Sequence, residues 1–192
     1  MHVNDRGSSQ PGSSTGGKID AREIVMGLHW DPTPEQSKEG PHDLDAACAL
    51  LDASGQVLEI VGPGRLRNAN GSVIHTGDSL TGASTWDDER IFVFVDALPE
   101  SVSALTFLVA NTSGRPWREI EGAACHVSDH ATDREWVRLD LTTLDARGAR
   151  GVATLTRGGD GWSIAAGPRT IDDALTSELS RVIDSGKGAK AQ

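Results

Sequence analysis

Two acidic segments hold the residues whose chemistry stands out most in this sequence. Asp43 and Asp45 lie two positions apart at the entrance to an apolar stretch. In extended backbone, side chains at that spacing point to the same side, so these two carboxylates could share one cation. The second segment runs from Gly71 to Gly82, includes Asp78, and continues to Asp87-Asp88-Glu89. Such loops can supply the oxygen ligands, about six to eight, that calcium requires.

Composition alone leaves two interpretations of these segments open. The spacing of an EF-hand, with alternating acidic residues and a distal glutamate, is missing. Carboxylates gathered without a cation would repel one another and raise each other's pKa. The segments can therefore be a calcium site, or they can be ordinary acidic loops exposed to solvent.

Other sequence patterns do not support an enzyme. Gly12–Gly16 matches the G-x-S-x-G motif of hydrolases, but no strand precedes it, and that motif requires a strand-to-helix turn. Gly62-Pro63-Gly64 has Arg67 where a dinucleotide motif needs its third glycine, and Lys187 has no phosphate-binding loop around it. His126 and His130 are four apart in a predicted strand end and turn, where that spacing does not align side chains for zinc.

Alternating apolar residues predict that most of the chain forms strands that bury one face. Asp52–Gly55 and Gly158–Gly161 are typical hairpin turns. We predict a mostly β fold, a β-sandwich of two sheets with a C-terminal helix. The expected strands cover residues 24–30, 46–51, 56–61, 91–95, 105–109, 136–141, 151–156 and 162–165, with 91–95 buried on both faces.

The two ends of the chain differ from its middle. Residues 1–18 are rich in Gly and Ser and predict a disordered tail. Thr170 and Asp173 resemble a capping box, and Ile171, Leu175, Leu179 and Val182 share one helical face. Gly186 is the predicted stop of this helix. The predicted organisation is therefore a tail (1–18), one domain (19–185) and a flexible C-terminal tail (186–192).

Composition narrows the class of protein and its partners. The formal net charge is -10, which argues against nucleic acid and anionic membrane surfaces, since both are polyanions. No stretch is long and apolar enough to span a membrane, and no export signal is recognisable at the N-terminus, so the expected location is the cytoplasm. Cys48 and Cys125 are predicted to be buried thiols and not a disulfide.

The order of the polar segments resembles the TerD family, the tellurium-resistance and general stress proteins of bacteria. The resemblance is carried by Gly27–Asp31, Asp43–Ala46, the Gly-Ser-Val-x-His-x-Gly-Asp stretch at 71–78, Thr81-Gly82 and Asp87–Glu89. It extends from about Glu23 to the end of the predicted helix near Asp184, and the stretch at 71–78 is its most specific part.

The resemblance implies a calcium-binding β-sandwich without established catalytic activity. It also implies a role in tolerance of tellurite and other stresses, with other stress-resistance proteins near the inner membrane as partners. His75 matches the family histidine and is expected to order its loop, because calcium prefers oxygen. Carried over by position, the candidate calcium ligands are Asp43, Asp45, Asp78, Asp87, Asp88 and Glu89.

Some positions depart from the family pattern. The region Gly62–Arg67 lacks the usual asparagine pair, Ser79 stands where the family has asparagine, and Ala83–Trp86 replaces a loop rich in glycine and acid. Each change removes an oxygen ligand or backbone freedom, so we expect reduced or lost calcium occupancy. Asparagines placed at Gly64 and Arg65 are expected to strengthen binding.

Three functions compete on this sequence. The first is a non-enzymatic calcium-binding stress protein. The second is a metal-free protein-interaction module on the same fold with degenerate calcium sites, for which Trp86 and Trp117 are the candidate exposed contacts because they lie in polar loops. The third is a hydrolase that uses Asp and His residues, for which the sequence offers no recognisable nucleophile and base.

Overall fold

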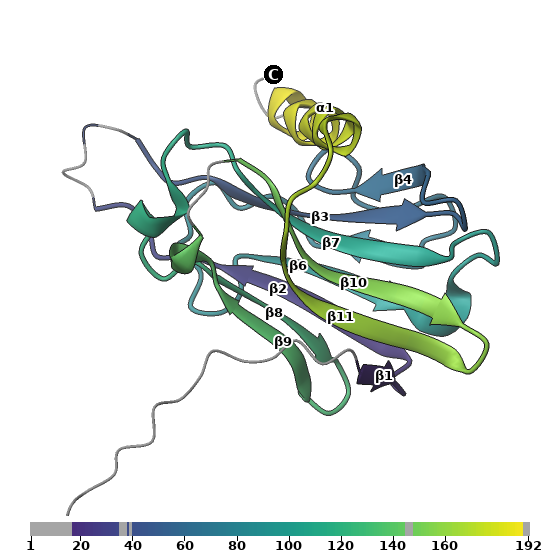
Figure 1. Ribbon diagram of the computed structural model, residues 1–192. Helices are drawn as coiled ribbons and strands as arrows, with labels where there is room; N and C mark the ends of the chain where they lie inside the picture. Colours follow the sequence, from purple (N-terminus) through teal and green to yellow (C-terminus); the bar gives the residue numbers. More distant parts are fainter. Residues whose placement is uncertain (1–16, 35–37, 39, 145–147, 190–192) are drawn as a thin grey trace, which may run out of the picture.

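A computed structural model of the 192-residue chain describes residues 17–34, 38, 40–144 and 148–189. Its elements form two antiparallel sheets and one α-helix, which confirms the predicted class (Figure 1). The six-stranded sheet has the order β1 (Gly17–Ile19), β11 (Gly161–Arg169), β10 (Arg150–Gly158), β7 (Ala104–Asn111), β3 (Leu44–Leu51) and β4 (Val57–Val61).

The second sheet has five strands and faces the first. Its order is β5 (Val73–His75), β6 (Glu89–Phe94), β2 (Glu23–His29), β8 (Ala124–Asp129) and β9 (Glu135–Asp140). Three short 3-10 helices connect strands at the ends of the sandwich: η1 (Val95–Ala97), η2 (Trp117–Glu119) and η3 (Leu141–Thr143). Alternate residues of each strand point between the sheets, as the period of two requires, and form the main core with Trp30, Phe107 and Trp117 as its largest side chains.

The helix α1 (Asp173–Ala189) covers the outer face of the six-stranded sheet (Figure 1). Leu179 and Ile183 are buried there against Ala47, Ala49 and Leu108 in a second apolar cluster. Strand β3 is consequently buried on both faces along most of its length. Asp172 caps the helix by accepting a hydrogen bond from the Leu175 amide at 2.7 Å, in place of the predicted Thr170.

The C-terminal end of α1 corrects one sequence prediction. The helix continues through Gly186 to Ala189, so residues 186–189 are helical and not a tail. Gly186 is buried, and a Cβ on it would lie 2.6 Å from the carbonyl carbon of Pro63. The residue is glycine because the helix backbone lies directly against the 63–64 backbone there. Its role is close packing, and it does not end the helix.

Other predictions need smaller corrections. Gly17 and Lys18 belong to β1, which pairs with β11, while the rest of the predicted tail lies outside the described residues. Strand β6 buries only one face, since Phe92 and Phe94 are partly exposed. Trp117 is fully buried because η2 turns it into the core, whereas Trp86 is 75% exposed as predicted. Both cysteines are buried and free.

Candidate metal site

Three of the predicted ligands converge at one end of the sandwich. Asp43 precedes β3, Asp45 lies in β3, and Asp78 lies in the loop after β5. One carboxylate oxygen from each lies within 4.8 Å of the others. Asp45 is fully buried, and the other two residues are partly buried. The cluster offers only oxygen donors, which suits a hard cation such as calcium.

Strand geometry explains why Asp43 and Asp45 face the same way. They stand two residues apart where β3 pairs with β7, with Leu44 opposite Asn111. Thr112 follows β7, and its amide donates to the Asp43 carbonyl at 3.2 Å. The spacing predicted from the sequence therefore holds, because the backbone is extended at this point.

Glu89 connects the strand to the loop that carries Asp78. Its Oε2 accepts a hydrogen bond from the Ala46 amide at 2.8 Å, and its Oε1 accepts one from the Ser79 amide at 3.0 Å. Ala46 follows Asp45 and Ser79 follows Asp78, so one fully buried carboxylate fixes the neighbours of two cluster members. Glu89 therefore positions Asp45 and Asp78 through the residues that follow them.

His75 holds the same loop, as expected. The Gly77 amide donates to its Nδ1 at 3.0 Å, so that nitrogen must be unprotonated. The proton of the neutral ring then lies on Nε2, which is 3.1 Å from Glu89 Oε2 and donates to it. Burial raises the pKa of Glu89, and the hydrogen bonds from His75, Ala46 and Ser79 oppose that rise.

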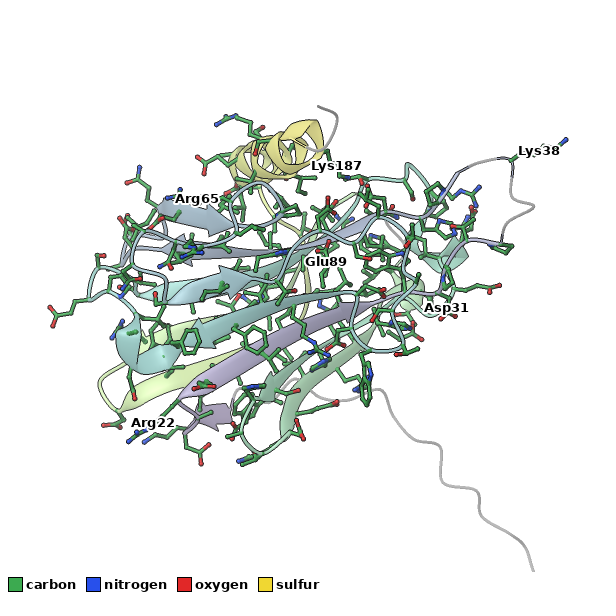
Figure 2. The ribbon with its side chains drawn as sticks, turned by 180° about the vertical axis from the view of Figure 1, so that it is seen from behind. Arg22, Asp31, Lys38, Arg65, Glu89 and Lys187 are labelled. Atoms are coloured by element: carbon green, nitrogen blue, oxygen red, sulfur yellow. The ribbon has the colours of Figure 1, made fainter. Side chains whose placement is uncertain are left out.

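Lys187 lies at the end of α1 (Figure 2). Its ammonium group inserts into the cluster. Its Nζ lies 2.5 Å from Asp43 Oδ2, 3.3 Å from Asp45 Oδ2 and 2.7 Å from Thr112 Oγ1. Burial lowers the pKa of Lys187, but the two carboxylates outweigh it and hold the pKa above its ordinary value. A cation already belongs to this site, supplied by the chain itself.

The cluster retains oxygens that no described residue satisfies. Asp43 Oδ1 and Asp45 Oδ1 are buried and accept no hydrogen bond from the described part of the chain. Burial, together with the nearby Glu89 and Asp43 charges, raises the pKa of Asp45 to about 7, although Lys187 opposes the rise. Buried carboxylate oxygens are costly without a partner, so the arrangement fits a cation that uses these oxygens.

Asp87 and Asp88 point away from this cluster. Asp87 Oδ2 accepts from Arg90 Nε at 3.0 Å and lies 3.2 Å from His126 Nε2. Burial would raise the pKa of Asp87, but the hydrogen bonds and charges of His126 and Arg90 hold it below its usual value.

Asp88 instead ties the loop of residues 83–88 to the end of β2. It accepts from the amides of Trp30 at 3.1 Å and Ser84 at 3.0 Å. Its Oδ2 also lies 3.0 Å from His29 Nδ1. Of the six candidate ligands, the structure thus brings three together, places Glu89 behind them, and directs Asp87 and Asp88 elsewhere.

Comparison with known proteins identifies the family. A profile described as the TerD domain matches residues 14–180. The chain belongs to the TerD family. It is 33% identical to the tellurium resistance protein TerZ of Serratia marcescens, over 84% of this chain and 89% of that protein. It is 30% identical to the stress response protein SCP2 of Bacillus subtilis (strain 168), over 88% of this chain and 94% of that protein.

A solved structure also shares the TerD-family fold. It is a homologue of the telluride resistance protein (TerD) from Streptomyces coelicolor A3(2), with a TM-score of 0.69 and 23% sequence identity. The alignment covers 81% of this chain and 94% of that one. This likeness confirms the two-sheet architecture.

Sequence reasoning missed two groups that shape this TerD-family site. Lys187 and Thr112 lie far from Asp43 in sequence, and only the docking of α1 and the pairing of β7 with β3 bring them together. Asn68 and Asn70 order the turn before β5: Asn68 Oδ1 accepts from the Val73 amide at 2.9 Å, and Asn70 Oδ1 accepts from the Ser72 amide at 3.1 Å. Their position next to Gly71 was a usable signal.

Gly64 is not a place for an asparagine ligand. A Cβ there would lie 2.0 Å from Ser185 Oγ and 2.1 Å from the Val182 carbonyl oxygen, so α1 would have to move. Arg65 is exposed and pairs with Glu59 at 2.5 Å, on the surface between β4 and β5. The region that departs from the family pattern therefore supports the helix.

Proposed function

We propose that this TerD-family chain is a non-enzymatic stress or tellurium-resistance protein that binds calcium through Asp43, Asp45 and Asp78. The observation that carries the proposal is the convergence of three carboxylates within 4.8 Å, with the buried Oδ1 atoms of Asp43 and Asp45 lacking a hydrogen-bond partner among the described residues. Calcium would use these oxygens, and water would complete its coordination. Glu89 and His75 would hold the Asp78 loop in place.

The type of donor atom in the cluster favours calcium over a softer metal. The cluster contains no sulfur or imidazole ligand among the described residues, and oxygen-only sites favour calcium, magnesium or manganese. Calcium accepts six to eight oxygens in a flexible geometry that water can complete, whereas magnesium demands a nearly ideal octahedron. We expect weaker binding than in a relative with the complete asparagine and glycine pattern, because fewer protein oxygens are present.

Titration calorimetry of metal-stripped protein tests this proposal. We expect calcium to bind the natural chain, and the Asp43→Asn/Asp45→Asn variant to lose most of that binding. Asp20→Asn/Asp160→Asn removes the same charge from two exposed positions and is the matched control. Asp87→Asn should also keep calcium affinity within about twofold, since its carboxylate pairs with Arg90 and His126. Equal losses in all variants would show only a net-charge effect and defeat the assignment.

A metal-free interaction module is the second candidate function. Lys187 already neutralises part of the acidic cluster, and Trp86 exposes 75% of its surface at the edge of the loop before Asp87. Exposed tryptophan is common in protein interfaces. Absence of calcium binding in the natural chain, together with a partner whose binding Trp86→Ala abolishes, would favour this candidate.

A hydrolytic function has weaker support. Asp87, His126 and Ser128 form a hydrogen-bonded series, with His126 Nδ1 at 2.7 Å from Ser128 Oγ. Ser128 is only 4% exposed and does not line the adjacent open cavity of about 480 Å³. A serine that a substrate cannot reach is not a nucleophile, so this series serves to orient His126.

Relatives and composition support the remaining parts of the proposal. The names of the similar proteins refer to tellurium resistance and stress response, which supports this role for the chain. We also propose, from the family resemblance, that other stress-resistance proteins near the inner membrane are its partners. A cytoplasmic location is part of the same proposal. Within the described part of the chain, no helix has the length and hydrophobicity needed to cross a membrane.

A further inference from the structure

We infer that Lys187 is an exchangeable counter-ion tethered to the acidic cluster, which competes with calcium and couples ion binding to the docking of the last turn of α1. The inference rests on the proposed function, since it concerns the regulation of the same site. It predicts two states of the chain: Lys187 bound without calcium, and the helix end released with calcium.

The contacts of Lys187 are those of a bound cation. Its ammonium has three protons to donate, and three oxygens lie within hydrogen-bond distance: Asp43 Oδ2 at 2.5 Å, Thr112 Oγ1 at 2.7 Å and Asp45 Oδ2 at 3.3 Å. Two of these oxygens belong to carboxylates that would bind calcium. A divalent ion and an ammonium held by the same two carboxylates would repel each other strongly in this partly buried position, so one must leave.

The last turn of α1 can leave without opening the core. The apolar side chains that anchor the helix, Leu179 and Ile183, lie before it. Beyond Ile183, the helix contacts the sandwich through Ser185 and the Gly186 backbone against Pro63-Gly64 and through the Lys187 ammonium. Release of Lys187 therefore exposes no large apolar side chain, and its cost is confined to the hydrogen bonds of the ammonium and to the contacts of Ser185 and Gly186 with Pro63-Gly64.

The sequence of this turn is also a poor helix former. Lys187 lies between Gly186 and Gly188, and glycine lowers helix stability because it loses the most backbone freedom on ordering. The turn is therefore held by its contacts with the cluster and not by its own propensity. A competing ion can displace such a helix end, because the turn stays helical only while its contact with the cluster is made.

Linkage then fixes the sign of the coupling. If calcium binding releases Lys187, Lys187 must weaken calcium binding by the same factor. Couplings of this kind are typically about 5- to 150-fold. Removal of the ammonium should therefore tighten calcium binding, even though it also removes a contact that orders Asp43.

Calorimetry of three full-length variants tests the inference. We expect Lys187→Gln to bind calcium on the order of tenfold more tightly than the natural chain. Arg181→Gln removes the same charge from an exposed position on the same helix and is the matched control. It should change the affinity far less. Lys187→Arg keeps the charge and should bind no more tightly than the natural chain.

A labelling experiment follows the lysine directly. Acetylation of the natural chain with an amine-reactive reagent, quantified by mass spectrometry, should modify Lys187 slowly without calcium and faster with it. Lys18 is exposed and serves as the internal control, with a rate independent of calcium. Faster labelling of Lys187 alone, with tighter binding in Lys187→Gln, supports the inference.

Two other outcomes would overturn it and are distinguishable. Equal calcium affinity in the natural chain and Lys187→Gln, without any change in labelling, would refute competition while leaving the proposed calcium site intact. No calcium binding in either protein would remove both the site and the competition. In that case Lys187 would be a permanent counter-ion, as the metal-free module requires.

Discussion

Glu89 Oε2 and the amide of Ala46 are 2.8 Å apart, and this hydrogen bond joins the start of β6 in one sheet to β3 in the other. The same carboxylate holds the loop after β5 through Ser79 and accepts a hydrogen bond from His75 Nε2. A side chain 0% exposed therefore connects the two sheets at the point where the acidic cluster forms. The sequence suggested Glu89 as a direct calcium ligand, but here its two oxygens accept hydrogen bonds that hold the neighbours of Asp45 and Asp78.

Replacement of Glu89 should destabilise the fold more than its size suggests. Glu89→Ala leaves the buried Ala46 amide, the partly buried Ser79 amide and His75 without their acceptor, and each lost partner costs about 1–3 kcal/mol. We expect a loss of at least about 3 kcal/mol in the free energy of unfolding. Urea denaturation measures it, and Glu23→Ala, an exposed residue at the start of β2, is the control. A loss under about 1 kcal/mol would contradict the role of Glu89 in joining β3 to β6 and to the loop after β5.

Gly64 should tolerate no side chain, because the helix backbone touches it. In Gly64→Ala, the added Cβ would lie 2.0 Å from Ser185 Oγ and 2.1 Å from the Val182 carbonyl oxygen. We expect a destabilisation of about 1–3 kcal/mol as α1 shifts. Gly62→Ala is the matched comparison, since its Cβ would lie 3.2 Å from Val182 Cγ1, which can move. Melting temperatures of both variants measure the difference; a similar melting temperature for both would argue against close packing of α1 at Gly64.

Asp45 should make the metal-free protein less stable as pH rises. Its pKa in the folded state is about 7, above the ordinary value of 3.8, so the folded chain binds this proton more tightly than the unfolded chain. The stability contributed by the protonated carboxyl is fully present below the ordinary value and is lost as pH rises towards 7.

The comparison that isolates this group is the natural chain against Asp45→Asn in the presence of a chelator. Between pH 5 and pH 8 the natural chain should lose more than about 1 kcal/mol relative to the variant, because one pH unit between folded and unfolded pKa corresponds to about 1.4 kcal/mol. Calcium should reverse the trend, since it requires the deprotonated carboxylate. Parallel pH profiles for the two proteins would show that Asp45 titrates normally.

Truncation at the N-terminus should lower the melting temperature only once it removes β1. Removing residues 1–16 is predicted to leave the melting temperature nearly unchanged, on their Gly- and Ser-rich composition. Removing residues 1–19 also deletes β1 and the buried Ile19, which is worth about 1.5–3 kcal/mol, or several degrees at this chain length. Thermal denaturation of the two truncated proteins tests the limit, and equal melting temperatures would show that β1 contributes nothing.

The sequence by itself determined the parts of this protein that depend on local pattern. Among the described residues, alternation of apolar residues predicted eight of the eleven strands and missed β1, β5 and β8. The turns at Asp52–Gly55 and Gly158–Gly161 predicted two hairpins that the structure contains. The spacing of Asp43 and Asp45 was sufficient to place both carboxylates on one side of β3, because side chains in a strand repeat every two residues. The polar motifs were sufficient to recognise the TerD family.

Only the tertiary structure decided which acidic residues join the cluster and which have other partners. Asp87, Asp88 and Glu89 are adjacent in sequence, yet one pairs with Arg90 and His126, one caps the backbone of Trp30, and one is buried behind the cluster. Lys187 is separated from Asp43 by most of the chain, and the helix reaches it only because its apolar face docks on the outer face of β3 and β7. The local sequence pattern does not show which distant residues come into contact, because those contacts depend on which faces of the helix and sheets pack together.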